Sequence, residues 1–102
     1  MKFGLTKEQY DFIITSIVQP LESLGSKVFC FGSRARGDFK PYSDLDIMVE
    51  NNDRDLSKEI NAIRDMTIES NFPYKIDLVL YSEFAESYKA NYSKDKRPFT
   101  RP

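Results

Sequence analysis

The 102-residue sequence contains no histidine, no tryptophan and a single cysteine, Cys30. Without histidine, Ser-His-Asp triads and ordinary zinc sites are excluded, so acid–base chemistry must come from carboxylates, lysine, tyrosine or water. A single cysteine cannot form an internal disulfide. Because Cys30 lies in an apolar run, we expect it to be a small buried core residue. These absences leave a carboxylate-based site as the main candidate for any chemistry.

Long apolar runs and an excess of one charge are also missing. No hydrophobic stretch approaches ~18 residues, so no membrane-spanning helix is predicted. The first residues, M-K-F-G-L-T-K-E, lack the hydrophobic region of a secretion signal, and we expect a cytoplasmic protein. Fifteen basic and sixteen acidic residues give a net charge of −1, which offers no overall electrostatic footprint for nucleic acid.

Helical and strand patterns alternate along the chain, which predicts an α/β fold with a small three-stranded mixed sheet and helices on one face. Thr6 and Gln9 match the capping-box pattern of a first helix that Pro20 should kink near Ser16. The second and third strands should be parallel because a crossover helix joins them. The expected helices are residues 6–24, 55–70 and 83–91, the last capped by Ser82, and the expected strands are 27–31, 43–50 and 74–81. We expect one domain over 1–92, followed by a polar, basic, mobile tail over 93–102.

The chain is organised around one stretch, F-C-F-G-S-R-A-R-G-D-F-K-P-Y-S-D-L-D-I-M-V-E, residues 29–50. In the strand predicted at its end, Asp44 and Asp46 are two residues apart and should therefore share one face. Two carboxylates held that close repel each other, so the arrangement favours a divalent cation between them. Hard cations such as Mg²⁺ bind a few carboxylate oxygens together with phosphate oxygens.

The residues just upstream are suited to holding those phosphates. Gly32 permits a tight turn with close backbone approach, and Ser33 adds a hydroxyl beside N–H groups that can form an anion-binding nest. Arg34, Arg36 and Lys40 place positive charge next to this turn, although basic side chains taken alone are most often a solvated face. A nucleoside triphosphate with its metal would satisfy both halves of the stretch.

A third carboxylate belongs to the next predicted strand. Asp77 alternates with the apolar Ile76 and Leu78. If the apolar sides of both strands face the helices, Asp44, Asp46 and Asp77 converge on the opposite, open face. Three carboxylates on one surface suit a two-metal site.

The combination G-S-R-A-R-G followed by S-D-L-D resembles the signature of the DNA polymerase β-type nucleotidyltransferase superfamily. Its spacing is similar to that of the minimal nucleotidyltransferases (MNT), MntA-like antitoxin partners of HEPN-domain proteins. The resemblance runs from about residue 28 to 80. The polar end of the chain departs from the family, in which a longer helix and an apolar segment usually follow the third strand.

The resemblance implies a role for each candidate residue in a nucleotidyltransferase fold. Asp44 and Asp46 would bind Mg²⁺ or Mn²⁺, and Asp77 would complete the metal and catalytic set by helping to activate the nucleophile. Gly32 and Ser33 would hold the β- and γ-phosphates of ATP. Arg36 would orient the loop or contact the phosphates.

Three functions follow as expectations. The first is AMPylation, the transfer of AMP from ATP to a hydroxyl of a partner protein, a HEPN toxin, with this chain as the antitoxin. The second is a non-catalytic module that neutralises a partner by occlusion. The third is one half of a small-molecule nucleotidyltransferase of the aminoglycoside-modifying kind. The sequence leaves open the acceptor, the choice of nucleoside triphosphate and the oligomeric state.

Overall fold

A computed structural model describes residues 2–51 and 54–100. Four strands form one sheet in the order β3-β2-β1-β4, and they are β1 (Lys27–Phe31), β2 (Leu45–Glu50), β3 (Ile76–Leu80) and β4 (Arg97–Pro98). β1 pairs antiparallel with β2 and β4, whereas β2 and β3 are parallel. The predicted mixed sheet is confirmed, with β4 added as a short fourth strand.

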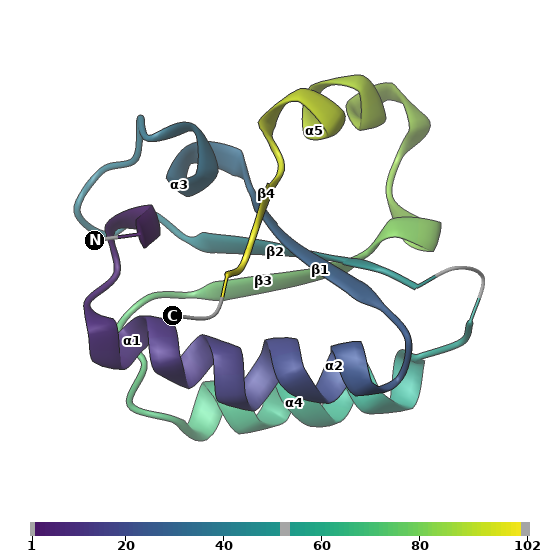
Figure 1. Ribbon diagram of the computed structural model, residues 1–102, viewed down its shortest axis with the longest axis horizontal. Helices are drawn as coiled ribbons and strands as arrows, with labels where there is room; N and C mark the ends of the chain where they lie inside the picture. Colours follow the sequence, from purple (N-terminus) through teal and green to yellow (C-terminus); the bar gives the residue numbers. More distant parts are fainter. Residues whose placement is uncertain (1, 52–53, 101–102) are drawn as a thin grey trace.

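One layer of helices covers the face of the sheet that carries the main core (Figure 1). It consists of a continuous helical run, α1 (Lys7–Ile13), a π-helical segment (Ile14–Val18) and α2 (Gln19–Ser23), together with α4 (Ser57–Glu69). The capping box at Thr6 is confirmed, since the Gln9 amide donates to Thr6 Oγ1 and Gln9 Oε1 accepts from the Thr6 amide. The π-helical segment lies just before Pro20, which lacks an N–H and cannot continue the regular ladder.

Alternation along the strands decides which side chains enter this core. In β2, Leu45, Ile47 and Val49 are fully buried against the helices, and in β3 Leu78 and Leu80 are buried beside them. The residues between them must point to the other face. Cys30 is also fully buried, as expected, and its burial raises the pKa of the thiol to about 12.

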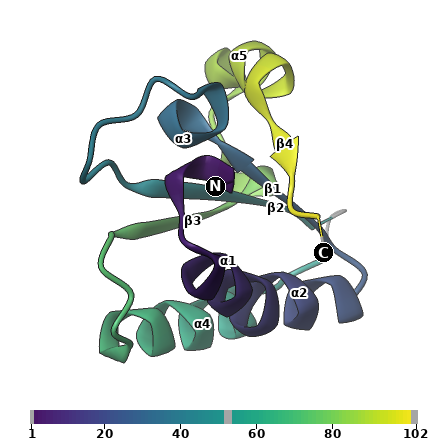
Figure 2. The same cartoon turned by 60° about the vertical axis from the view of Figure 1, so that its left-hand side comes forward.

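The opposite face is not bare. The short helix α3 (Gly32–Arg36) and α5 (Lys89–Asp95) lie over it and contact each other (Figures 1 and 2). The expectation of helices on only one face is therefore wrong. The expected helix over 83–91, capped by Ser82, has wrong bounds. The chain forms two short 3-10 helices, Tyr81–Glu83 and Glu86–Tyr88, and the α-helix α5 begins only at Lys89. Phe84 interrupts a continuous helix because its backbone is extended, and its ring packs against Phe31 with centroids 5.9 Å apart.

The expected mobile tail is wrong within the described residues. Arg97 and Pro98 pair with β1, and Phe99 is only 7% exposed in the main core. The Thr100 amide donates to Tyr10 Oη at 2.7 Å, and Tyr10 Oη donates to the Thr100 carbonyl at 3.0 Å. A two-residue strand and one buried ring have no periodicity, which is why the sequence pattern concealed them.

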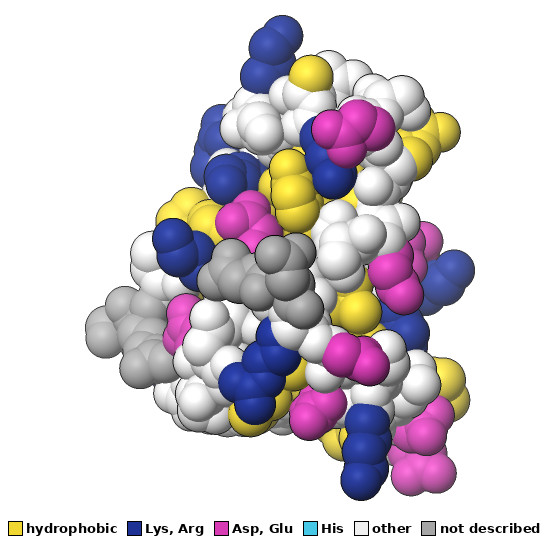
Figure 3. All heavy atoms as spheres, turned by 90° about the vertical axis from the view of Figure 1, so that its right-hand side faces the viewer, with side chains coloured by type: hydrophobic (Ala, Val, Ile, Leu, Met, Phe, Trp, Pro, Cys, Tyr) yellow, Lys and Arg dark blue, Asp and Glu magenta, His cyan; other side chains and the backbone are white. Residues whose placement is uncertain are grey.

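The charge distribution agrees with the near-zero net charge. On the face shown in Figure 3, acidic and basic side chains are interspersed and hydrophobic side chains form small separate patches. Within the described part of the chain, none of the helices has the length and apolar character needed to cross a membrane.

The packing of Phe99 gives a first prediction. Phe99→Ala should lower the free energy of unfolding by about 3 kcal/mol, because it removes a buried aromatic side chain from the core. Chemical denaturation monitored by circular dichroism would measure the change. Pro98→Ala, at an exposed neighbouring position, is the matched control and should change stability by less than about 1 kcal/mol. Equal stability of Phe99→Ala and the parent would contradict the packing.

Candidate functional site

Two of the three predicted aspartates are strand neighbours. In the parallel pair β2–β3, Asp46 is in register with Asp77, and both alternate with side chains that pack against the helices. Asp44 lies just before β2, which begins at Leu45 rather than at residue 43 as expected. The Leu45 amide donates to the Lys75 carbonyl at 2.8 Å and so starts the pairing of the two strands.

The negative charges of Asp44 and Asp77 affect the ionisation of Asp46. The pKa of Asp46 is raised to about 6, first by burial and then by the negative charges of Asp77 and Asp44. Arg36 and Lys75 act in the opposite direction. No described residue donates a hydrogen bond to the Asp46 carboxylate, so its oxygens remain available as ligands. This donor set, carboxylate oxygens in a like-charge cluster, fits a hard divalent cation.

The side-chain positions do not themselves form a closed metal site. Among residues 2–51 and 54–100, no three histidine, cysteine, aspartate or glutamate side chains are arranged closely enough to hold an ion. The ligand roles of Asp44, Asp46 and Asp77 therefore stay predictions. Phosphate oxygens of a substrate would have to supply part of the coordination, as is common for Mg²⁺.

Gly32 joins the turn to the aspartates. Its φ is +73°, and a Cβ atom built there would collide with Oδ2 of Asp46 and lie 3.2 Å from its Cγ. Only glycine satisfies both the left-handed backbone and this close approach. Ser33 follows in the first turn of α3, so the Gly-Ser turn and the second aspartate of S-D-L-D are in direct contact.

Arg34 has a structural role that its sequence context did not reveal. It is 2% exposed; Nε donates to the Ser43 carbonyl at 2.9 Å and Nη1 donates to the Phe3 carbonyl at 2.8 Å. Its guanidinium lies 4.2 Å from the ring centroid of Tyr74. Arg34 therefore ties the N-terminal turn to the residue preceding Asp44 and is not part of a solvated basic face.

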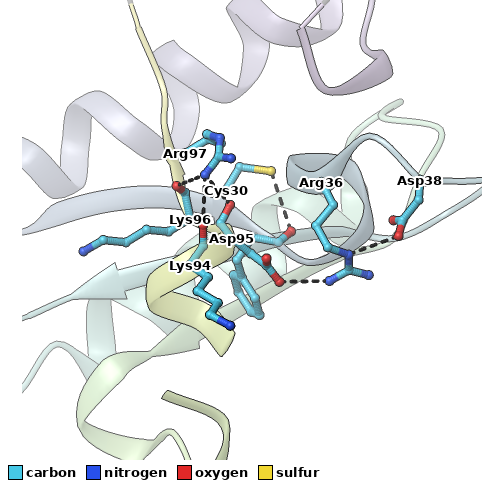
Figure 4. Close-up of polar contacts among 8 residues, drawn as sticks. Cys30, Arg36, Asp38, Lys94, Asp95, Lys96 and Arg97 are labelled. Atoms are coloured by element: carbon cyan, nitrogen blue, oxygen red, sulfur yellow. Dashed lines mark hydrogen bonds and ion pairs between the residues drawn. The ribbon is translucent and has the colours of Figure 1, made fainter. Parts of the chain in front are cut away.

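Arg36 extends from α3 toward α5 (Figure 4). Its Nε pairs with Asp38 Oδ2 and its Nη1 with Asp95 Oδ2, both at 3.2 Å. These ion pairs fit the expected role of orienting the loop. Contact with a phosphate would require Arg36 to exchange one of these carboxylates for the ligand.

Two hollows border the candidate site, one beside the Gly-Ser turn and one beside Asp77. One, of about 250 Å³, is bordered by Gly32 and Arg36 on one side and by residues around α5 on the other. The other is a groove of about 480 Å³ between β3 and α4, and Asp77 forms part of its wall. The Gly-Ser turn and Asp77 thus open onto different cavities.

Two glycine substitutions distinguish the effect of the Gly32–Asp46 contact from the effect of a positive φ. Gly32→Ala should abolish binding of ATP·Mg²⁺, because the new Cβ displaces the Asp46 carboxylate and blocks the turn. Gly37→Ala is the matched control. Its φ is +90°, but a Cβ there meets nothing within 4 Å. Isothermal titration calorimetry should show parent-like affinity for Gly37→Ala, and equal affinity in the two variants would contradict the role of the contact.

The burial of Asp46 and its repulsion by Asp77 and Asp44 predict a pH-dependent stability. Between about pH 4 and 6 the folded state retains the Asp46 proton that the unfolded chain has lost, so the free energy of unfolding falls as pH rises. Above about pH 6 the Asp46 carboxyl is ionised in both states, so the destabilisation that it causes no longer changes with pH. Asp46→Asn should therefore stabilise the fold at pH 7.5 by about 1–2 kcal/mol, since solvent screens part of the effect at this half-exposed carboxyl, and have little effect near pH 4.

Thermal and urea denaturation at both pH values would measure this difference. Asp65→Asn, which removes one negative charge from the exposed surface of α4, controls for the change in net charge. A gain for Asp46→Asn that is the same at pH 4 and pH 7.5 would contradict the repulsion.

The chain was compared with known protein families and solved structures. The family model described as a nucleotidyltransferase domain matches residues 13–100, a span that includes Gly32, Ser33 and all three aspartates. No curated protein matches the chain. Among solved structures it is similar to a protein from Sulfolobus solfataricus, provisionally described as a nucleotidyltransferase. The sequence identity is 21%, the alignment covers 99% of this chain and 89% of the other, and the TM-score is 0.44.

Proposed function

Because the chain belongs to the nucleotidyltransferase domain family, we propose that it transfers AMP from ATP to a hydroxyl group of a partner protein. The observation that carries the proposal is the contact of Gly32 with Asp46, which is itself in register with Asp77. The Gly-Ser turn thus lies against Asp46, and Asp46 is the strand neighbour of Asp77, which supports a shared site for phosphate and metal. As in the sequence-based expectation, the acceptor is a HEPN-domain toxin and this chain is its antitoxin.

Each side chain has a specific task in this proposal. Asp44 and Asp46 hold Mg²⁺ or Mn²⁺, with Asp77 contributing its carboxylate to the same face; the ion, when bound, neutralises charge on the triphosphate. The Gly32–Ser33 turn holds the β- and γ-phosphates. Asp77 orients the acceptor hydroxyl and accepts its proton. The oxygen then attacks the α-phosphorus in line, and pyrophosphate leaves.

The groove beside Asp77 supports a protein acceptor. β3 is an edge strand, and the carbonyl of Lys75, the residue just before it, accepts a hydrogen bond from the Leu45 amide of β2. In a parallel pair the alternate residues, Ile76, Leu78 and Leu80, therefore turn their backbone groups outward. Arg64 Nη2 donates to the Leu78 carbonyl at 2.6 Å from that outer side.

An extended peptide that displaces Arg64 from the Leu78 carbonyl can pair with such an edge. A residue opposite Asp77 in the added strand would share the face of Asp77, with Cβ atoms about 5 Å apart. A side-chain hydroxyl at that position would lie beside the carboxylate proposed to activate it.

Mass spectrometry tests the reaction directly. The chain, ATP and Mg²⁺ would be incubated with the product of its neighbouring gene, the proposed HEPN-domain acceptor. Transfer should add about 329 Da to the acceptor, the mass of an AMP group replacing a proton. The Asp44→Ala/Asp46→Ala variant is the control and should add nothing. An acceptor of unchanged mass in the presence of the parent chain would refute the proposal.

The proposed role of Asp77 can be separated from that of Asp46. Asp77→Asn should leave ATP·Mg²⁺ binding within a few-fold of the parent but reduce the transfer rate by about 10²–10⁴-fold, the scale for loss of a general base. Asp46→Asn should weaken both binding and transfer. Calorimetry and a transfer assay on the two variants measure the contrast. Equal loss of nucleotide binding would make Asp77 an ordinary ligand, and no loss of either property would remove it from the site.

A non-catalytic binding module is the second candidate function. It is favoured by Arg36, whose guanidinium is engaged by two carboxylates of the chain itself, Asp38 and Asp95. In this case the Asp44→Ala/Asp46→Ala variant would still neutralise the toxin in a growth assay at the same dose as the parent. Loss of protection in that variant would favour the enzyme.

A further inference from the structure

The hollow of about 250 Å³ beside Gly32 is lined by four aromatic residues, together with Gly32, Asn91 and the Arg36–Asp95 ion pair. Phe31 comes from the end of β1, and Phe84, Tyr88 and Tyr92 come from the segment that leads into and forms α5. We propose that this pocket binds the nucleobase of the triphosphate by stacking, chiefly on Tyr88. The proposal rests on the proposed function, because it assumes that the triphosphate occupies the adjoining Gly-Ser turn.

Strand order assigns the pocket to the nucleotide rather than to the acceptor. The order β3-β2-β1-β4 places Asp77 on one side of Asp46 and the Gly32 turn, which follows β1, on the other. Gly32 and Arg36 line the aromatic pocket, whereas Asp77 lines the groove beside β3. A molecule whose phosphates lie at Gly32 therefore has this pocket as its neighbour, on the side away from the proposed proton acceptor.

The floor of the pocket is already fixed without a ligand. Phe31, Phe84 and Tyr92 pack edge to face, with ring centroids 5.6–6.0 Å apart. Tyr92 Oη donates to Glu50 Oε2 at 2.6 Å, which anchors α5 to the sheet. A rigid aromatic floor reduces the conformational entropy lost when a flat ring binds.

Tyr88 differs from the other three aromatic residues. It is 60% exposed and touches Phe84 with ring centroids 5.8 Å apart, so much of its ring is free. An exposed ring beside an aromatic floor is the arrangement that stacks on a base, since every base presents a π-face. The small volume suits one ring system, because pockets for whole drug-sized ligands usually span about 300–1,000 Å³.

Calorimetric titration with two probes, ATP·Mg²⁺ and tripolyphosphate·Mg²⁺, tests the pocket. Tyr88→Ala should weaken ATP binding by about 5–100-fold, the range for loss of one aromatic–base stack, and leave tripolyphosphate binding unchanged. Tyr88→Phe should restore the affinity for ATP. Tyr42→Ala, which removes a ring that is 85% exposed on another loop, is the matched control and should bind both probes like the parent.

The outcomes separate this inference from the proposed function. Parent-like ATP binding by Tyr88→Ala would overturn the pocket even if AMP transfer to the partner is observed. Equal weakening of both probes would overturn it as well, because the effect would then not involve the base. A selective loss of ATP binding in a chain that transfers no AMP would support the pocket and refute the proposed reaction. If the parent binds neither probe, both proposals fail.

Discussion

The repulsion between like-charged carboxylates at the start of β2 and β3 is the feature on which the rest of the site depends. Asp46 is held there because its neighbours Leu45 and Ile47 are fully buried in the core. Moving Asp46 away from Asp77 would require shifting the strand register and withdrawing those side chains from the core. Burial on one face thus maintains repulsion on the other, and the pKa of Asp46 is raised first by its own burial and then by this repulsion. A site strained in this way is suited to a cation that relieves the repulsion.

Three residues of the segment before β2 hold the aspartate cluster in place. Gly32 has no side chain where the Asp46 carboxylate lies, and Arg34 anchors the chain just before Asp44 from a buried position. Arg36 connects the same helix to α5 through Asp95. The G-S-R-A-R-G sequence therefore combines backbone freedom, a structural arginine and a link to the C-terminal segment within six residues.

Residues with a strong local pattern were predictable from the sequence. The phase of Asp46 and Asp77 followed from alternation with aliphatic residues, and the first helix followed from its capping box and apolar spacing. Arg34 was not predictable, since its carbonyl partners at Phe3 and Ser43 are distant or irregular in the sequence. The order of residues 93–100 was also missed, because Phe99 gains its burial from packing against residues near the opposite end of the chain, Phe3 and Tyr10.

The packing of the C-terminal segment leaves the two sides of the proposed site unequally covered. In-line transfer requires the attacking and leaving oxygens to be on opposite sides of the phosphorus. The sheet provides two such sides, because β1 with its Gly-Ser turn and β3 with Asp77 flank the central strand β2. α5 closes only the β1 side, where its aromatic residues meet Phe31, whereas the outer edge of β3 has no strand partner among the described residues. A small donor held in a walled pocket and a large acceptor approaching an open edge are the two partners that this asymmetry fits.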